Sequence, residues 1–153
     1  MDRDTKEKIV EEVASCPSPH AVCFEALRLM EKHHRWVSDE DLREVAELLD
    51  MTPEEVDASA TFYNHIYREP VGRHVILICE SVTCWIMGQE TIRDFLKRHL
   101  GIEIGETTSD NRFTLLPIQC LGACDCAPAM MVDDDLYGDL DAEKVKQILE
   151  CYD

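Results

Sequence analysis

The sequence lacks the short motifs that mark nucleotide sites and hydrolytic active sites. Its six glycines never form G-x-G-x-x-G or a Walker A loop, so no nucleotide site is expected. There is no G-x-S-x-G, and the six histidines form no H-x3-H or H-E-x-x-H pattern. C-x-x-C is also missing, which argues against thiol–disulfide exchange of the thioredoxin type. These absences leave no recognisable substrate site on the chain.

Positive charge and long hydrophobic runs are scarce as well. The chain has 15 Lys and Arg against 32 Asp and Glu, for a net charge of −17. Because such an acidic surface repels phosphate backbones and anionic lipids, nucleic acid is not an expected partner. No stretch approaches the ~20 apolar residues of a membrane span, and the charged N-terminus does not resemble a signal peptide. We therefore expect a cytoplasmic protein without direct membrane insertion.

Cysteine, in contrast, is abundant, with eight residues among 153. In a reducing cytosol this number favours metal or redox chemistry over disulfides. Four of the cysteines form two local pairs, each of which begins where an apolar strand is predicted to stop. Neighbouring strands that end at one sheet edge would bring the four sulfurs together, and four thiolates are the usual ligands of iron–sulfur clusters and of structural zinc. The pairs are Cys79-x4-Cys84 and Cys120-x3-Cys124.

The spacing within the pairs favours an iron–sulfur cluster but leaves zinc open. Zinc knuckles typically use C-x2-C, whereas the longer loops here can wrap a larger group. Small residues in Leu121-Gly122-Ala123 would let backbone N–H groups approach sulfur. Cys126 is interpreted as a spare thiol beside the site, with exchange through Cys124-Asp125-Cys126 as a distant alternative. The other three cysteines, Cys16, Cys23 and Cys151, are interpreted as ordinary packed or loop residues.

The sequence pattern changes near Pro70 and divides the chain into residues 1–70 and 71–153. The first part is predicted to be helical, beginning with a helix from Asp4 or Thr5 to Ser15. Its later helices begin at N-cap signals: Ser18-Pro19, Ser38 with Asp41, and Thr52-Pro53 with Glu55. The second part alternates strands and helices: strands over 74–78, 112–118, 129–132 and 136–140, and helices over 88–100 and after Asp141. This order predicts an α+β protein whose second part is a small α/β sandwich.

The cysteine segments resemble a known family. The stretch from Arg112 through Cys120-Leu-Gly-Ala-Cys124 to Val132, and the stretch from Val71 to Cys84, resemble the small [2Fe–2S] subunit of respiratory complex I, the E-type subunit of the bacterial NADH:quinone oxidoreductase. The similarity covers nearly the whole chain. It implies a helical bundle, residues 1–70, that helps to dock on a partner, and a thioredoxin-like domain, residues 71–153, that holds one [2Fe–2S] cluster. The ligands that it implies are Cys79, Cys84, Cys120 and Cys124.

The resemblance also implies a function, that of a one-electron carrier subunit of an oxidoreductase complex. The partner would be a flavoprotein subunit that binds FMN and NADH, with an iron–sulfur-rich subunit nearby. The complex would place the chain peripherally on the cytoplasmic face of the inner membrane. The acidic surroundings predict a low reduction potential, nearer the plant-type ferredoxin value of about −400 mV than the Rieske range. Trp85, directly after Cys84, would either pack in a core or interface or shield the cluster from water.

Three alternatives stay open at this point. The same module resembles subunits of NAD-linked formate dehydrogenases and NAD(P)-linked hydrogenases, which would keep the cofactor and change the enzyme. A zinc-stabilised interaction module would have no redox role at all. A free-standing ferredoxin would work without a partner, although a minimal carrier has no need of the helical first part.

Overall fold

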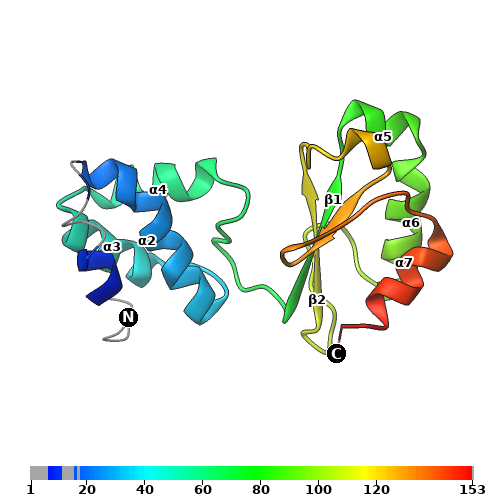
Figure 1. Ribbon diagram of the computed structural model, residues 1–153. Coiled ribbons are helices and arrows are strands. Elements are labelled where there is room, and N and C mark those ends of the chain that lie inside the picture. Colours follow the sequence, from blue (N-terminus) through cyan, green and yellow to red (C-terminus); the bar gives the residue numbers. More distant parts are fainter. Residues whose placement is uncertain (1–6, 12–15, 17, 153) are drawn as a thin grey trace. The chain divides into compact units, whose positions relative to one another are not determined.

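The structure is a computed structural model that describes residues 7–11, 16 and 18–152 (Figure 1). The chain divides into two compact units, Met1–Pro70 and Val71–Asp153, and each is described by itself. The described helices include none that is both long and apolar enough to cross a bilayer. The combination of helices with a mixed sheet confirms the predicted α+β class.

The first unit is helical. It contains α2 (Pro19–His34), α3 (Asp39–Leu49) and α4 (Pro53–Phe62), and residues 7–11 are helical as well. The expected ends of the first helix, at Asp4 or Thr5 and at Ser15, lie outside the described residues. The capping boxes predicted at Ser38 and Thr52 are both present, with the Asp41 and Glu55 side chains accepting from the N-cap backbone. Ser18 is the N-cap of α2, but its side chain accepts no capping hydrogen bond among the described residues.

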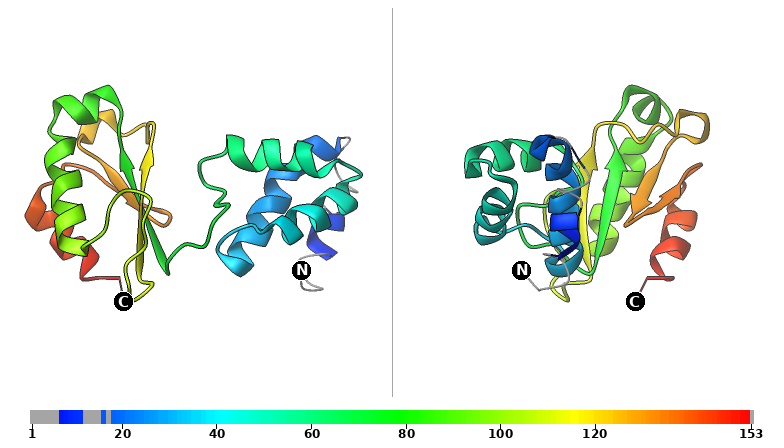
Figure 2. Two further views of the ribbon diagram at one scale, coloured as in Figure 1. Left: turned by 180° about the vertical axis from the view of Figure 1, so that it is seen from behind. Right: turned by 60° about the vertical axis from the view of Figure 1, so that its left-hand side comes forward.

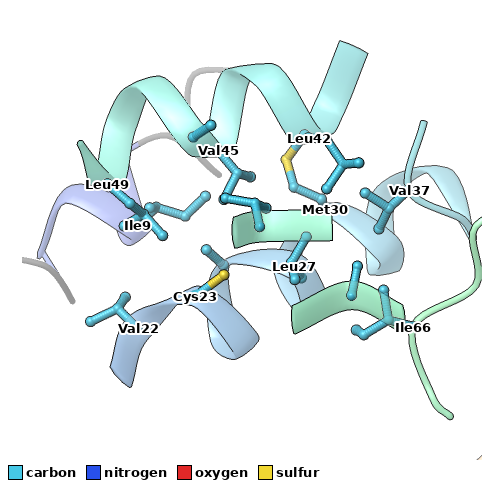
Figure 3. Close-up of a cluster of buried hydrophobic side chains, with 14 residues drawn as sticks. Ile9, Val22, Cys23, Leu27, Met30, Val37, Leu42, Val45, Leu49 and Ile66 are labelled. Atoms are coloured by element: carbon cyan, nitrogen blue, oxygen red, sulfur yellow. The ribbon is translucent and has the colours of Figure 1, made fainter. Parts of the chain in front are cut away.

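The helices of the first unit enclose their own apolar core. Its side chains, several of which Figure 3 shows converging between α2 and α3, include Ile9, Val22, Leu27, Val45 and Leu49. Cys23 belongs to this core and is 1% exposed, so its interpretation as a packed residue is confirmed. Burial raises the pKa of the Cys23 thiol, and this effect outweighs a hydrogen bond with Ser59 that lowers the pKa.

The second unit is a four-stranded mixed sheet with helices packed on it. The strands run in the order β2-β1-β3-β4, with β1 parallel to β2 and the other pairs antiparallel. Figures 1 and 2 show α6 and α7 together on one face of the sheet, where Ile76 and Ile78 pack in one core with Ile92, Leu96 and Val145. The elements are β1 (His74–Cys79), α5 (Val82–Ile86), α6 (Gln89–Leu100), β2 (Phe113–Ile118), the 3-10 turn η1 (Cys124–Cys126), β3 (Met130–Val132), β4 (Asp135–Tyr137) and α7 (Ala142–Leu149).

The strands and helices of this unit differ in places from the sequence-based expectation, several of them by one residue at an end. The helix predicted over 88–100 starts one residue later, because Gly88 is its N-cap in the left-handed region, at φ 94°. The short helix α5 before it was missed. The strand predicted over 136–140 ends at Tyr137, since the backbone N–H of Asp139 turns to donate to the carbonyl of Cys126 (2.6 Å). Gly101 ends α6 and Asp141 caps α7, as predicted.

Candidate metal centre

The first cysteine pair lies at the buried end of strand β1. Cys79 is the last residue of the strand, and its N–H donates to the carbonyl of Ala129 (3.2 Å). Cys84 was expected in a loop, but it lies within the short helix α5. A hydrogen bond from the Trp85 N–H to the Ser81 carbonyl (2.9 Å) helps to close this helical turn. Cys79 and Cys84 are each 2% exposed. The first pair is therefore held on regular elements and shielded from solvent.

The second pair lies in the segment after β2 and is exposed. Cys120 follows the end of β2, and Cys124 begins η1. The parallel register of β1 and β2 pairs Cys79 with Ile118, so both strands end at the same edge of the sheet. Gly122 adopts φ 76°, a left-handed conformation that glycine enters without a Cβ penalty, and its N–H donates to Cys120 Sγ (3.4 Å). The predicted approach of a backbone N–H to sulfur is thus present.

The electrostatics of the thiols show that the two pairs meet. Burial, then a hydrogen bond with Cys79 and the charges of Cys79 and Cys124, raises the pKa of Cys84 to about 11, although a backbone hydrogen bond with Ala129 lowers it. The N–H of Gly122, then the Ser81 hydroxyl, lowers the pKa of Cys120, with smaller effects from Cys124 and Cys79. Each of the four predicted thiols therefore interacts with at least one thiol of the other pair.

The number and arrangement of the thiols indicate which kind of metal group they could hold. In the part of the chain that the structure describes, no three His, Cys, Asp or Glu side chains are placed to hold one metal ion. The thiols instead form a buried pair and an exposed pair. Four thiolates are the usual ligand set of a [2Fe–2S] cluster and also serve structural zinc. The chemistry of the donor set therefore fits a [2Fe–2S] cluster.

The remaining cysteines lie outside this set of four. Cys126 packs against the cluster of buried residues around Cys79 and Cys84, and its thiol donates to the carbonyl of Ala123 (3.6 Å). Cys151 is exposed and donates to the carbonyl of Gln147 (3.4 Å). Cys16 packs against the core of the first unit.

The side chains on the outside of α5 were not anticipated. Trp85 is 57% exposed, which rules out the core packing considered for it. Three neighbours on and just beyond the helix are exposed too: Val82, Ile86 and Met87. The signal was present in the sequence, because Ser81 followed by Val82, Trp85 and Ile86 has an N-cap and helical spacing. Its length, five residues, is below that at which periodicity distinguishes a helix from a loop.

Two proteins of known name are similar to this chain along nearly its whole length. The E-type subunit of the NADH-quinone oxidoreductase of Pseudomonas aeruginosa is 43% identical over 152 residues, covering 99% of this chain and 92% of its own. The same subunit of Escherichia coli strain K12 is 43% identical over 147 residues, covering 96% and 89%.

A similar fold is found among solved structures. An NAD⁺-reducing [NiFe]-hydrogenase in the air-oxidised state matches with a TM-score of 0.64 at 26% identity over 72% of this chain. The match spans about a fifth of that hydrogenase chain, 19%.

The family comparison confirms the resemblance that the cysteine segments suggested. The model of the family described as thioredoxin-like [2Fe–2S] ferredoxin matches residues 8–153, and so includes all four paired cysteines. The chain therefore belongs to the thioredoxin-like [2Fe–2S] ferredoxin family.

Proposed function

We propose that this chain is the electron-carrying subunit of an NADH:quinone oxidoreductase and that Cys79, Cys84, Cys120 and Cys124 hold its [2Fe–2S] cluster. The observation that carries the proposal is the meeting of two distant thiol pairs at one sheet edge. Relatives named as the E-type subunit of this enzyme match almost the full length of the chain and support the assignment. When bound, such a cluster supplies one-electron chemistry.

The four thiols have different parts in holding the cluster. Cys79 and Cys84 lie on the buried side and keep water from one side of the site. Cys84, with its pKa raised to about 11, is protonated at neutral pH and must release its proton to become a ligand, so loading is coupled to proton release. Gly122 N–H, which donates to Cys120 Sγ, stabilises negative charge on that sulfur.

The chain needs a partner because nothing in its sequence offers an NADH or flavin site. NADH gives up two electrons as hydride, and a flavin can divide them into single electrons. The partner is a flavoprotein subunit that binds FMN and NADH, next to an iron–sulfur-rich subunit on the cytoplasmic face of the inner membrane. Residues 1–70, which have their own core, help to dock on the partner, while residues 71–153 carry the cluster.

A second candidate is the equivalent subunit of an NAD-linked hydrogenase. The likeness to the NAD⁺-reducing [NiFe]-hydrogenase at a TM-score of 0.64 favours it. The hydrogenase is 26% identical over 72% of this chain. The NADH-quinone oxidoreductase relative is 43% identical along nearly the whole chain, and this higher identity favours the first candidate.

The test is reduction by NADH in the presence and absence of the flavoprotein. The chain is co-expressed and purified anaerobically with the FMN-binding flavoprotein of the same operon, and electron paramagnetic resonance is recorded after NADH addition. We expect the reduced [2Fe–2S] signal in the pair but not in the isolated chain, which only dithionite reduces. A Cys126→Ser variant serves as the matched control and keeps the signal. A pair that NADH leaves without this signal, although its flavin is reduced, contradicts the proposal.

A further inference from the structure

Ser81 lies opposite Cys120 at the edge where strands β1 and β2 end. The parallel register pairs Cys79 with Ile118, and the ladder continues past this pair, because the Glu80 N–H donates to the carbonyl of Ile118 (2.8 Å). Two positions beyond the pair, the same register places Ser81 beside Cys120. Figure 1 shows α5, the helix that follows Ser81, at this end of the sheet. A residue of the first cysteine loop therefore faces a cysteine of the second.

The side chain of Ser81 uses this position to contact the sulfur. Its hydroxyl forms a hydrogen bond with Cys120. Ser81 is the N-cap of α5, but among the described residues its side chain makes no capping hydrogen bond, so the hydroxyl is not committed to the helix. The Ser81 carbonyl accepts from the Trp85 N–H (2.9 Å), and the residue before it, Glu80, is bonded to β2. Backbone hydrogen bonds on both sides of Ser81 therefore fix the place from which its hydroxyl reaches Cys120.

Hydrogen-bond donors at Cys120 matter for the redox chemistry of a cluster. The Gly122 N–H donates to Cys120 Sγ from the same loop (3.4 Å), and the Ser81 hydroxyl reaches it from the other loop. The thiols of Cys124 and Cys79 also contact Cys120, but they lose their protons when they bind metal. An added electron increases the negative charge on the cluster sulfurs, and hydrogen bonds to these sulfurs help to set the potential. A donor at this sulfur therefore stabilises the reduced form more than the oxidised form.

We infer that Ser81 is a positioning residue of the cluster site, whose hydroxyl donates to Cys120 Sγ in the loaded chain and raises the reduction potential. The inference rests on the function proposed above, because it concerns the same four ligands. The Gly122 contact comes from the backbone and survives any side-chain replacement. The Ser81 contact comes from a side chain, so a single substitution removes it and leaves all four ligands in place.

The test compares Ser81→Ala with Ser109→Ala, which removes an exposed hydroxyl in the turn before β2, at the opposite end of that strand. Each cluster-loaded chain is titrated anaerobically with dithionite, and electron paramagnetic resonance gives the midpoint potential. We expect Ser81→Ala to lower the equilibrium constant for one-electron reduction about threefold, which is about 28 mV at about 59 mV per tenfold change. Ser109→Ala should leave the midpoint unchanged. Ser81→Thr keeps the hydroxyl and should keep the midpoint of the unaltered chain.

Two further readouts distinguish a direct hydrogen bond from a general structural effect. The shift caused by Ser81→Ala should be the same at low and high salt, because salt screens distant exposed charges and not a direct contact. Resonance Raman spectra of the oxidised cluster should show the Fe–S(Cys) stretching bands displaced in Ser81→Ala and unmoved in Ser81→Thr. The iron and sulfide content should be the same in all of these chains.

The outcomes separate this inference from the function on which it rests. If the unaltered chain holds no [2Fe–2S] cluster, the proposed function fails. If it holds the cluster and Ser81→Ala keeps its midpoint, the role of Ser81 is wrong and the function stands. A lowered midpoint that Ser81→Thr shares would also overturn the inference. Should Ser81→Ala fail to load its cluster, Ser81→Gly is measured with the same expected decrease, because glycine is tolerated at N-cap positions. Loss of the cluster from both would assign Ser81 to cluster assembly and overturn the inference.

Discussion

At the scale of single residues, the site is defined by two thiols whose acidities move in opposite directions. Burial and the neighbouring Cys79 raise the pKa of Cys84 to about 11. The N–H of Gly122 and the hydroxyl of Ser81 lower the pKa of Cys120, which is exposed. A thiolate reacts with electrophiles and a thiol hardly does, so the two residues differ in reactivity before any metal binds.

This contrast predicts the order of alkylation in the metal-free chain. At pH 7, iodoacetamide should modify Cys120 well before Cys84, because a lowered pKa leaves more thiolate at Cys120 and a raised pKa leaves almost none at Cys84. Raising the pH towards 9 should speed modification at Cys84 and change the rate at Cys120 less. Peptide mass spectrometry after timed quenching follows both sites. Modification of Cys84 first would show that the two environments are assigned wrongly.

The sequence singles out four thiols, which stay the proposed ligands, but it does not predict their surroundings. Pair spacing and position after apolar strands singled out Cys79, Cys84, Cys120 and Cys124, because strand ends are readable from β-branched apolar runs. The burial of one pair and exposure of the other could not be predicted. Burial depends on contacts made by distant segments, such as Ala129 beside Cys79, and these are set by the sheet order rather than by local pattern.

At the scale of elements, the 3-10 turn η1 is fastened to the segment between β4 and α7. Asp139 N–H donates to the carbonyl of Cys126 (2.6 Å), and Leu140 N–H to that of Pro128 (3.2 Å). Gly138 lies so close to this turn that an added Cβ would come within 2.6 Å of the Cys126 carbonyl oxygen and would also meet the Cys126 thiol. The missing side chain at position 138 therefore allows the two segments to meet, next to Cys124.

This contact predicts a cost for the smallest possible side chain at position 138. Gly138→Ala should lower the free energy of unfolding by about 1–3 kcal/mol, because the backbone carbonyl of Cys126 cannot move aside without breaking its bond to Asp139. Urea denaturation of the cluster-loaded chain measures the change. Gln147→Ala, at an exposed position on α7, is the control and should change stability little.

Adding Cys126→Ala to Gly138→Ala separates the two contacts. The double variant should recover only part of the lost free energy of unfolding. Its substitution removes the clash with the Cys126 thiol, but the clash with the Cys126 carbonyl stays. A Gly138→Ala chain as stable as the unaltered one would mean that η1 can shift freely, which would contradict the tight contact between η1 and the segment after β4.

The elements themselves were predictable to different degrees. The capping boxes at Ser38 and Thr52 were identified because they are local sequence signals with a defined hydrogen-bond pattern. The short helix α5 was not, because five residues are too few for helical periodicity to be recognised. The early end of β4 was not, because it depends on a tertiary contact. β4 ends where Asp139 turns to the carbonyl of Cys126, a residue on a different segment.

At the scale of the whole molecule, the acidic charge of the chain sets the expected redox behaviour. A net charge of −17 disfavours the addition of one more electron, whereas Gly122 N–H pointing at Cys120 Sγ favours it at short range. The backbone of Ala129 makes a second such contact, at Cys84, and we expect the net charge to outweigh both. The reduction potential of the cluster should then lie nearer about −400 mV than the Rieske range.

A dithionite titration followed by electron paramagnetic resonance checks this potential. Neutralising an exposed carboxylate away from the site, for instance with Asp134→Asn, should raise the midpoint reduction potential slightly. The shift should be upward at both low and high salt. It should be smaller at high salt, because salt screens the charge. A midpoint well above that of the nicotinamide couple would contradict the dominance of charge.

The most direct measurement of the central claim is the iron and acid-labile sulfide content of the anaerobically purified chain. The account predicts two of each per chain, an absorption spectrum typical of a [2Fe–2S] cluster, and loss or alteration of both on Ser replacement at position 79, 84, 120 or 124. Ser at position 16, 23, 126 or 151 should leave the content and spectrum unchanged. Stoichiometric zinc in place of iron, or an unaltered spectrum after replacement of any of the four paired cysteines, would contradict it.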